Sequence, residues 1–236
     1  MELTFAQQEP ATIRRLFAQI APRYDLANTL LSLGLDALWR CHVAARVARW
    51  APRDILDLAT GSGALAAEIS RQVPGARLIG ADFCASMLTL ARRRGLKELV
   101  VADGLALPFQ SDRFDVVTIA FGLRNMALYE VAVGEMCRVL RSGGHVVILD
   151  FSFPSPPFLW GYRFYLHHIL PVLAGWVTGE PEAYRYLGES IEGFPKGEKM
   201  LELLNRCGFR NCDAKSLSRG IVTVYTGQVV RGQASV

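Results

Sequence analysis

Between residues 54 and 151 the chain alternates short apolar runs with segments of helical periodicity. A strand of a parallel sheet reads as a continuous apolar run, because helices cover both faces of such a sheet. The alternation therefore indicates a doubly wound α/β sheet. The predicted strands are residues 55–59, 77–81, 99–102, 114–120 and 145–151, and the predicted helices between them are residues 65–73, 86–94 and 131–140.

A glycine turn ends the first predicted strand, in the run Asp57-Leu-Ala-Thr-Gly61-Ser-Gly63. Glycines between a strand and a helix let the backbone approach a ligand closely and direct helix amides at an anionic group. Asp82 ends the second strand, at the position where a carboxylate binds ribose hydroxyls in dinucleotide folds. Asp82 could instead cap the following helix, but the glycine turn before it favours ribose binding.

Two further features of the sequence distinguish an S-adenosylmethionine (SAM)-binding core from an NAD-binding core. Asp103-Gly104 follows the third run, where an acid and a backbone clamp can bracket an adenine. The run Arg138-Val-Leu-Arg-Ser-Gly-Gly144 precedes the fifth strand and resembles the corresponding turn of class I methyltransferases. Taken in order, these motifs resemble the SAM-binding core of that superfamily rather than the core of an NAD-dependent oxidoreductase.

The rest of the chain fits around such a core. A helix near residues 198–207 and two runs near 209–214 and 221–227 predict an antiparallel hairpin at the end of the sheet. The expected fold is thus a class I methyltransferase Rossmann-like α/β sheet of seven strands, mostly parallel. We expect an N-terminal helical cap (1–50), a SAM-binding core (51–151), a helical, apolar lid insertion over the substrate (152–195), and a C-terminal helix with closing strands (196–236).

A narrower resemblance begins at Phe121-Gly-Leu-Arg-Asn125. This run, after Asp103-Gly-Leu-Ala-Leu-Pro-Phe109, resembles the menaquinone and ubiquinone biosynthesis C-methyltransferases, and the likeness covers nearly the whole chain. Further matching stretches are Arg23-Tyr-Asp-Leu-Ala-Asn28, Leu38-Trp39-Arg40, Tyr165, His168-Ile-Leu-Pro171 and Tyr184-Arg-Tyr-Leu-Gly-Glu-Ser-Ile191. The resemblance implies that the protein uses SAM to methylate a ring carbon of a prenylated quinol.

The resemblance and the motifs together give a set of cofactor-binding candidates. These are Asp57, Gly61, Ser62, Gly63, Asp82, Phe83, Asp103, Gly104 and Ala120. Two positions depart from the family pattern. Ala120 stands where a serine is common, so that only a backbone contact is expected there, and Phe194 stands where a histidine is often found.

The implied reaction needs no metal, because the sulfonium methyl group of SAM is already an electrophile. The protein must align the ring carbon, exclude water and favour the quinolate, whose charge a guanidinium stabilises. Arg124 is the candidate for that role, with Asn125 as an orienting hydrogen bonder. Asp150 and His168 are candidate bases, although a lone histidine in an aromatic stretch is more often structural, and we favour that role for His168. Substrate-pocket candidates that could also be ordinary packing residues are Tyr24, Tyr184, Arg185 and Tyr186.

The composition of the chain also bears on its expected ligand and surroundings. Hydrophobic residues make up 51% of the chain and charged residues 20%, which favours a lipid-like ligand or a membrane surface. The most apolar segment, residues 151–177, is interrupted by prolines and is not a membrane-spanning helix. The net charge of +4 is modest and its basic residues are scattered, so nucleic acid is not an expected partner.

Five cysteines without metal-ligand spacing fit buried thiols in a reducing cytoplasm. We therefore expect a cytoplasmic enzyme in peripheral contact with a membrane, with a possible homodimer. The alternatives are another small-molecule SAM methyltransferase that shares only the core, and a non-catalytic SAM- or quinol-binding accessory protein. An NAD-dependent oxidoreductase is a more distant alternative.

Overall fold

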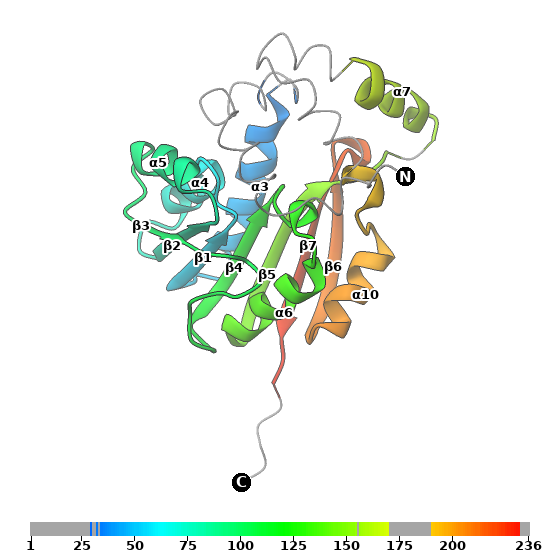
Figure 1. Cartoon of the computed structure of the whole chain (residues 1–236). Coiled ribbons are helices and arrows are strands. Elements are labelled where there is room, and N and C mark those ends of the chain that lie inside the picture. The colour runs from blue at the N-terminus through cyan, green and yellow to red at the C-terminus, as the bar shows by residue number, and fades with distance from the viewer. Residues whose placement is uncertain (1–28, 30–31, 33, 155, 170–189, 232–236) are drawn as a thin grey trace.

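The computed structural model describes residues 29, 32, 34–154, 156–169 and 190–231, and its centre is a seven-stranded sheet. The strands are β1 (Asp54–Leu58), β2 (Arg77–Asp82), β3 (Glu98–Val101), β4 (Phe114–Ala120), β5 (Leu140–Phe151), β6 (Phe209–Leu217) and β7 (Val222–Val229). Their spatial order is β3-β2-β1-β4-β5-β7-β6 (Figure 1). Neighbouring strands from β3 to β5 pair in parallel, whereas β7 runs antiparallel to both β5 and β6. The predicted fold class is confirmed.

Helices cover both faces of this sheet. Those described are α3 (Leu35–Ala48), α4 (Ala64–Gln72), α5 (Ala85–Arg93), α6 (Tyr129–Val139), α7 (Phe158–Phe164) and α10 (Glu198–Arg206), with the short turns η3 (Leu123–Asn125), η4 (Tyr165–Ile169) and η5 (Ser218–Gly220). The helices α6 and α10 share one apolar cluster with the sheet. The helices α3 and α4 share another on the opposite face, where α5 packs beside α4.

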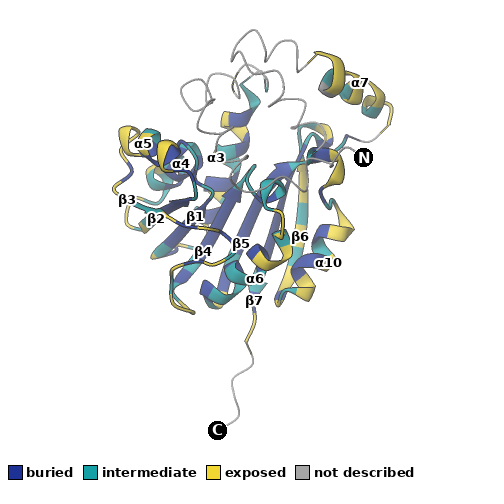
Figure 2. Cartoon of the chain, viewed as in Figure 1, coloured by how far each residue is buried: buried dark blue, intermediate teal, exposed yellow. Residues whose placement is uncertain are grey.

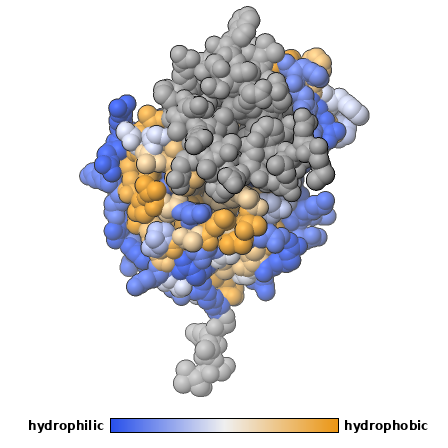
Figure 3. Space-filling model, in the orientation of Figure 1, coloured by the Kyte–Doolittle hydropathy of each residue, from blue (hydrophilic) through white to orange (hydrophobic). Residues whose placement is uncertain are grey.

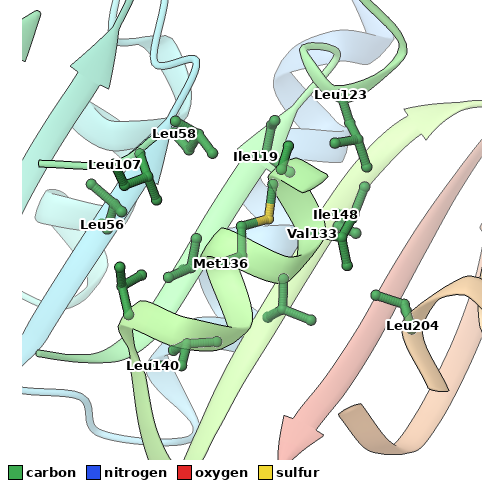
Figure 4. Close-up of a cluster of buried hydrophobic side chains, with 14 of the residues drawn as sticks. Leu56, Leu58, Leu107, Ile119, Leu123, Val133, Met136, Leu140, Ile148 and Leu204 are labelled. Atoms are coloured by element: carbon green, nitrogen blue, oxygen red, sulfur yellow. The ribbon is translucent and has the colours of Figure 1, made fainter. Parts of the chain in front are cut away.

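Alternate residues of each central strand explain the two clusters. In β1, Leu56 and Leu58 pack toward α6, while Ile55 packs toward α3. Figure 4 shows Met136 of α6 reaching toward Ile119 of β4 on the first of these faces. Full burial of a side chain of this size stabilises the fold by roughly 1.5–3 kcal/mol, so apolar contact holds the helices on the sheet.

Two strand boundaries differ from the sequence-based prediction by three residues or more. β5 begins at Leu140 rather than His145, and its pairing with β4 shifts register between Phe114 and Val116. The shift absorbs Gly143, whose φ is +83°, as an irregularity inside the strand. β6 likewise continues to Leu217, because its pairing with β7 extends further than the apolar pattern of the sequence.

Beyond β5 the chain leaves the sheet at the end where the parallel strands finish. Figure 1 shows α7 above that end, and Figure 2 shows that α7 is largely exposed while the central strands are buried. The helical segments α7 and η4 agree with a helical insertion, although residues 170–189 lie outside the described residues. The predicted helix near residue 13 lies outside them as well, and the four-region division stays a prediction. Within the described chain, no helix is both long and apolar enough to cross a bilayer.

Candidate active site

The order of the strands reverses between β1 and β4, and ligands of open α/β sheets bind at the carboxyl ends of strands beside such a reversal. The residues that directly follow these two strands, Ala59 and Phe121, have left-handed φ angles of 49° and 57°. The loops touch, because a Cβ on Gly122 would lie 2.5 Å from the Ala59 Cβ. Such strained non-glycine residues concentrate at functional sites. Nothing in their residue types would have identified Ala59 or Phe121 as strained.

The glycine turn after β1 is built for close packing. Gly61 and Gly63 have φ angles of +56° and +79°, which glycine adopts without strain. A Cβ on Gly63 would lie 2.5 Å from the Leu96 Cδ1 atom, so no other residue fits between the turn and the end of α5. The Thr60 amide donates to the Ala81 carbonyl at 3.0 Å, which holds the turn against β2. The turn is therefore a rigid cradle at the crevice.

Asp57 lies beneath this cradle. Its side chain is buried, and its two carboxylate oxygens accept hydrogen bonds of 2.6 Å from the Thr60 and Thr118 hydroxyls. Burial raises the pKa of Asp57 to about 6. These contacts make Asp57 a support for the turn, and its predicted contact with a cofactor stays a prediction.

Asp82 joins the cradle to the next loop. Its carboxylate accepts the Gly61 amide at 2.8 Å and the Cys84 amide at 2.9 Å, and burial raises the pKa of Asp82 above its usual range. The bond to Cys84 is of the helix-capping kind considered as an alternative above. Because each carboxylate oxygen can accept a second hydrogen bond, ribose binding is compatible with it. That ribose contact stays a prediction.

Other cofactor candidates lie around the same crevice. Ser62 is buried, and its carbonyl and hydroxyl accept bonds of 2.8 and 2.9 Å from Arg94. Phe83 packs with Met87 at the start of α5. Asp103 is exposed and accepts the Leu105 amide at 2.9 Å.

Helix α6 holds the loop that begins at Asp103. The Glu135 carboxylate accepts the Leu107 amide at 2.7 Å, and Arg138 donates to the Phe109 and Leu107 carbonyls at 2.7 and 3.0 Å. Glu135 and Arg138 also pair with each other at 2.6 Å. We call these two residues the α6 clamp. Sequence reasoning assigned Arg138 only to a turn motif and missed this contact.

Across the crevice, Arg124 of η3 and Asp150 of β5 form a buried ion pair. Arg124 Nη1 donates to Asp150 Oδ1 at 2.8 Å and to the Phe121 carbonyl at 2.7 Å. The exposed fractions of the two side chains are only 6% and 0%. Within the described part of the chain, Arg124 Nε and Asp150 Oδ2 are buried without a hydrogen-bond partner. Leaving buried polar atoms unsatisfied is costly, so this donor and this acceptor are candidates for contact with a ligand.

Aromatic rings surround this ion pair. The Phe121 and Phe151 rings lie 4.7 Å apart, and the Arg124 guanidinium carbon is 5.1 Å from the centre of the Phe151 ring. Trp39 of α3 packs against both rings, while its indole nitrogen donates to Ser218 at 2.8 Å. The pair is therefore the polar centre of an aromatic enclosure, suited to a planar apolar ring with polar substituents.

Tyr162 of α7 belongs to the same surroundings. Burial raises the pKa of Tyr162, while the positive charge of Arg124 acts in the opposite direction. The phenol therefore stays protonated at neutral pH. Sequence reasoning missed Tyr162, because one more aromatic residue in an aromatic-rich insertion gives no distinguishing signal.

The remaining predicted residues divide into three groups. Asn125 lies in η3 beside Arg124 and donates to the Phe121 carbonyl at 3.3 Å, so it supports the strained loop. His168 is exposed and packs on Phe164 at 4.9 Å between ring centres, which agrees with a structural role. The four pocket candidates, Tyr24, Tyr184, Arg185 and Tyr186, lie outside the described residues.

The two departures from the family pattern have packing explanations. Ala120 ends β4 and packs against the apolar cluster beneath α3. Phe194 is buried and meets the Tyr129 ring edge-on at 5.7 Å. Neither position contacts the Arg124–Asp150 pair through a hydrogen bond in the described chain.

Sequence comparisons agree on one group of relatives. The model of the ubiE/COQ5 methyltransferase family matches residues 5–229. A demethylmenaquinone methyltransferase from Thermus thermophilus is 46% identical over 219 residues, which cover 90% of this chain and 99% of that protein. A ubiquinone/menaquinone biosynthesis C-methyltransferase UbiE from Syntrophotalea carbinolica is 40% identical, with 91% of this chain and 92% of that protein covered.

Solved structures agree on the fold. A SAM-dependent methyltransferase from Thermotoga maritima, a possible histamine N-methyltransferase, superposes with a TM-score of 0.65 at 16% identity, covering 91% of this chain and 98% of that one. Human N-acetylserotonin methyltransferase in complex with SAM superposes with a TM-score of 0.61 at 15% identity, covering 89% of this chain and 56% of that one. At these identities the likeness concerns the fold alone.

Proposed function

Because the chain belongs to the ubiE/COQ5 methyltransferase family, we propose that it transfers a methyl group from SAM to a ring carbon of a prenylated quinol. The protein is a SAM-dependent methyltransferase, as the sequence resemblance predicted. Demethylmenaquinol is the substrate to test first, since relatives covering nearly all of this chain carry that activity in their names. The equivalent ubiquinone precursor is the second candidate.

The cradle fits SAM. Gly61 and Gly63 keep side chains out of the turn, and a Cβ on Gly104 would lie 2.8 Å from the Met126 Cε atom, so the loop after β3 is also closely packed. We assign the cofactor contacts to these two loops, with Asp82 at the ribose. The chemistry that SAM supplies is an electrophilic methyl group on a sulfonium.

The observation that carries the proposal is the unpartnered donor and acceptor of the Arg124–Asp150 pair. A quinol hydroxyl can donate to Asp150 Oδ2, and the oxygen can accept from Arg124 Nε. As the proton moves to Asp150, the guanidinium stabilises the quinolate oxygen. The electron density gained by the ring makes the ring carbon nucleophilic. A bond from this carbon to the methyl group would form as the bond from sulfur to methyl breaks and S-adenosylhomocysteine leaves. The ring carbon would then release its proton to solvent, and Asp150 would return its proton to the quinol oxygen.

The aromatic rings around the ion pair would orient the quinol ring. Phe121 and Phe151 lie beside the guanidinium and can pack on the faces or edges of a quinol ring. Trp39 ties this wall to the turn after β6. Orientation in a site without water lowers the barrier, because the reacting groups are already aligned and poorly screened.

The direct test is a transfer assay with methyl-labelled SAM and reduced demethylmenaquinone. We expect label in the quinone fraction, on a ring carbon, and little transfer to small phenols or amines without a prenyl chain. Transfer only to such small molecules would favour the broader methyltransferase alternative. SAM binding without transfer to any acceptor would favour the accessory-protein alternative.

Contact with a membrane surface is the second part of the proposal. α7 and η4 expose Phe158, Trp160, Phe164 and Ile169, of which Trp160 is 74% exposed. Basic side chains are interspersed, since Arg219 lies 4.9 Å from the Phe158 ring and Arg163 lies in α7 itself. Figure 3 shows hydrophobic and hydrophilic atoms side by side in this region. Aromatic residues beside cations suit the interface of an anionic bilayer, where the prenyl tail of the substrate is held.

The predicted cytoplasmic location and the possible homodimer have no structural support of their own and stay predictions. Light scattering at several protein concentrations would test the dimer.

A further inference from the structure

Lys196 lies between the insertion and α10, close to the crevice but outside the machinery described above. Its ammonium donates to the Glu192 carbonyl at 3.0 Å and lies 4.4 Å from the centre of the Phe153 ring. An ammonium has three donors. In the described chain, no carboxylate forms an ion pair with Lys196, so a partly buried charge is available to a ligand.

The backbone beside Lys196 is fixed over the end of β5. The Gly197 amide donates to the Tyr225 hydroxyl at 2.9 Å. On the antiparallel ladder Tyr225 pairs with Ile148 and Thr223 pairs with Asp150. Side chains two residues apart share a face of a sheet, so Tyr225 and Asp150 project to the same side. The segment that carries Lys196 is therefore anchored on the face that presents Asp150.

Aromatic rings connect Lys196 with the Arg124 side of the site. The Phe153 ring under the ammonium meets the Tyr162 ring edge-on at 6.1 Å between centres. Tyr162 in turn lies within the electrostatic influence of Arg124. Lys196 and Arg124 thus approach the same aromatic region from two directions.

The charges around Lys196 come from several elements. The pKa of Lys196 is lowered to about 8, chiefly by burial; Arg163 of α7 and Lys199 of α10 also act to lower it, whereas Glu192 and Asp150 act to raise it. At neutral pH the ammonium is still mostly charged, although poorly solvated. An anionic oxygen placed beside it would replace the missing solvation.

We propose that Lys196 is a second cationic contact for the substrate, which donates to the quinol oxygen that the Arg124–Asp150 pair does not hold. A quinol carries two ring oxygens on opposite carbons, so a pocket that orients the ring benefits from a polar contact at each. This inference rests on the proposed function and adds a specificity-determining residue to it. It predicts that Lys196 favours acceptors with two ring oxygens over monophenols.

The test compares Lys196→Met, Lys196→Arg and the exposed control Lys215→Met on β6 with the unaltered enzyme. We expect Lys196→Met to lower kcat/KM for demethylmenaquinol by about tenfold near pH 7, the size of one charged hydrogen bond. The ratio of kcat/KM of the unaltered enzyme to that of Lys196→Met should fall toward one as the pH rises through about 8, because the lysine loses its charge. Lys196→Arg should keep its activity to higher pH, and Lys215→Met should match the unaltered enzyme at every pH.

Two further measurements exclude a merely structural role. SAM affinity and thermal unfolding should be unchanged in Lys196→Met, while its affinity for a short-chain quinol analogue falls by a similar factor. Equal kcat/KM for Lys196→Met and unaltered enzyme, or a loss that is the same at every pH, would overturn the inference and leave the proposed function intact. Absence of quinol methylation by the unaltered enzyme would overturn both.

Discussion

Arg124 illustrates how one side chain serves two purposes in this site. Its Nη1 atom donates to the Phe121 carbonyl and to Asp150, which stabilises the left-handed loop after β4. Its Nε atom is buried without a hydrogen-bond partner in the described chain, and we propose that this atom meets the substrate. A lysine could keep the charge next to Asp150 but could not donate in both directions with fixed geometry. Substitution by lysine therefore tests the directed hydrogen bonds of Arg124 while the positive charge is kept.

We expect Arg124→Lys to lower kcat/KM for the quinol by about 10- to 100-fold, with SAM affinity changed less than about twofold. Steady-state kinetics and calorimetric titration with SAM measure the two quantities. Lysine retains an ion-pair partner for Asp150, so gross unfolding is not expected, and a thermal scan checks it. A parallel loss of SAM affinity would contradict the assignment of Arg124 to the substrate.

Asp57 gives a prediction about stability and pH. Its folded-state pKa of about 6 exceeds the unfolded value of about 3.9, so the folded protein binds this proton more tightly. Folding then loses stability as pH rises from about 4 to about 6, because burial penalises the charge, and the loss is complete above the folded pKa.

The variant Asp57→Asn removes this titration. The difference in free energy of unfolding between this variant and the unaltered protein should shift in favour of the variant by about 3 kcal/mol from about pH 4 to about pH 7. Altered hydrogen bonds would add a difference that does not depend on pH. Urea unfolding at a series of pH values measures the difference. A difference that does not vary with pH would show that Asp57 is not charged in an apolar setting.

Single residues also mark the limit of sequence-based prediction. The positions of the glycine turn, Asp82 and Arg124 near the strand ends could be predicted, because glycine spacing and family motifs depend on residue types. The left-handed conformation of Ala59 could not, since an alanine carries no local signal for positive φ. The support role of Asp57 depends on Thr118, which lies 61 residues away in sequence.

At the scale of elements, the α6 clamp connects a helix to the loop that is expected to hold adenine. Arg138→Met keeps the aliphatic part of the side chain and removes the donors to Phe109 and Leu107. We expect the KM for SAM to rise about 5- to 20-fold while kcat changes less, because the loop loses its fixed position.

The matched control is Arg206→Met on α10, which removes an exposed ion pair with Glu130 of α6. Exposed pairs contribute little, so this variant should behave like the unaltered enzyme. If both variants raised the KM for SAM equally, the effect would not come from the clamp.

The strands and helices show which elements a sequence can predict. β4 has the bounds predicted from its apolar run, because a central strand buried on both faces has an unbroken apolar pattern. The predicted start of β5 was wrong, because the strand already pairs with β4 at Leu140. Pairing resumes at His145 after an irregularity that contains Ser142-Gly143-Gly144, whose polar and glycine residues are typical of a turn. Hydrogen bonding to a neighbouring strand is not visible in local composition.

For the whole molecule, the exposed aromatic face of α7 and η4 predicts binding to anionic membranes. Trp160→Ala combined with Phe164→Ala should reduce sedimentation with vesicles of phosphatidylglycerol and phosphatidylcholine by about tenfold. Binding of the unaltered protein should fall at high salt, because the basic residues around the face are screened.

Val131→Ala provides the control, since Val131 is also exposed but lies on α6. This variant should bind vesicles like the unaltered protein. Equal binding by the double variant and the control would show that the α7 face does not reach the lipid.

The architecture of the whole molecule could be predicted from the alternation of strands and helices, and the family from motifs outside the generic core. The substrate enclosure could only be predicted in part. Trp39, Phe121 and Phe151 come from three elements, and their meeting depends on helix and strand packing that periodicity does not specify.

The central claim is carbon methylation of a prenylated quinol at the Arg124–Asp150 pair. The most direct measurement is the mass spectrum of lipid quinones from a bacterial mutant that lacks this methylation and expresses the present chain. We predict that the unmethylated quinone is replaced by a product one ring methyl heavier, and that Arg124→Lys greatly reduces this replacement. An unchanged quinone pool, in cells where the protein is folded and binds SAM, would contradict the claim.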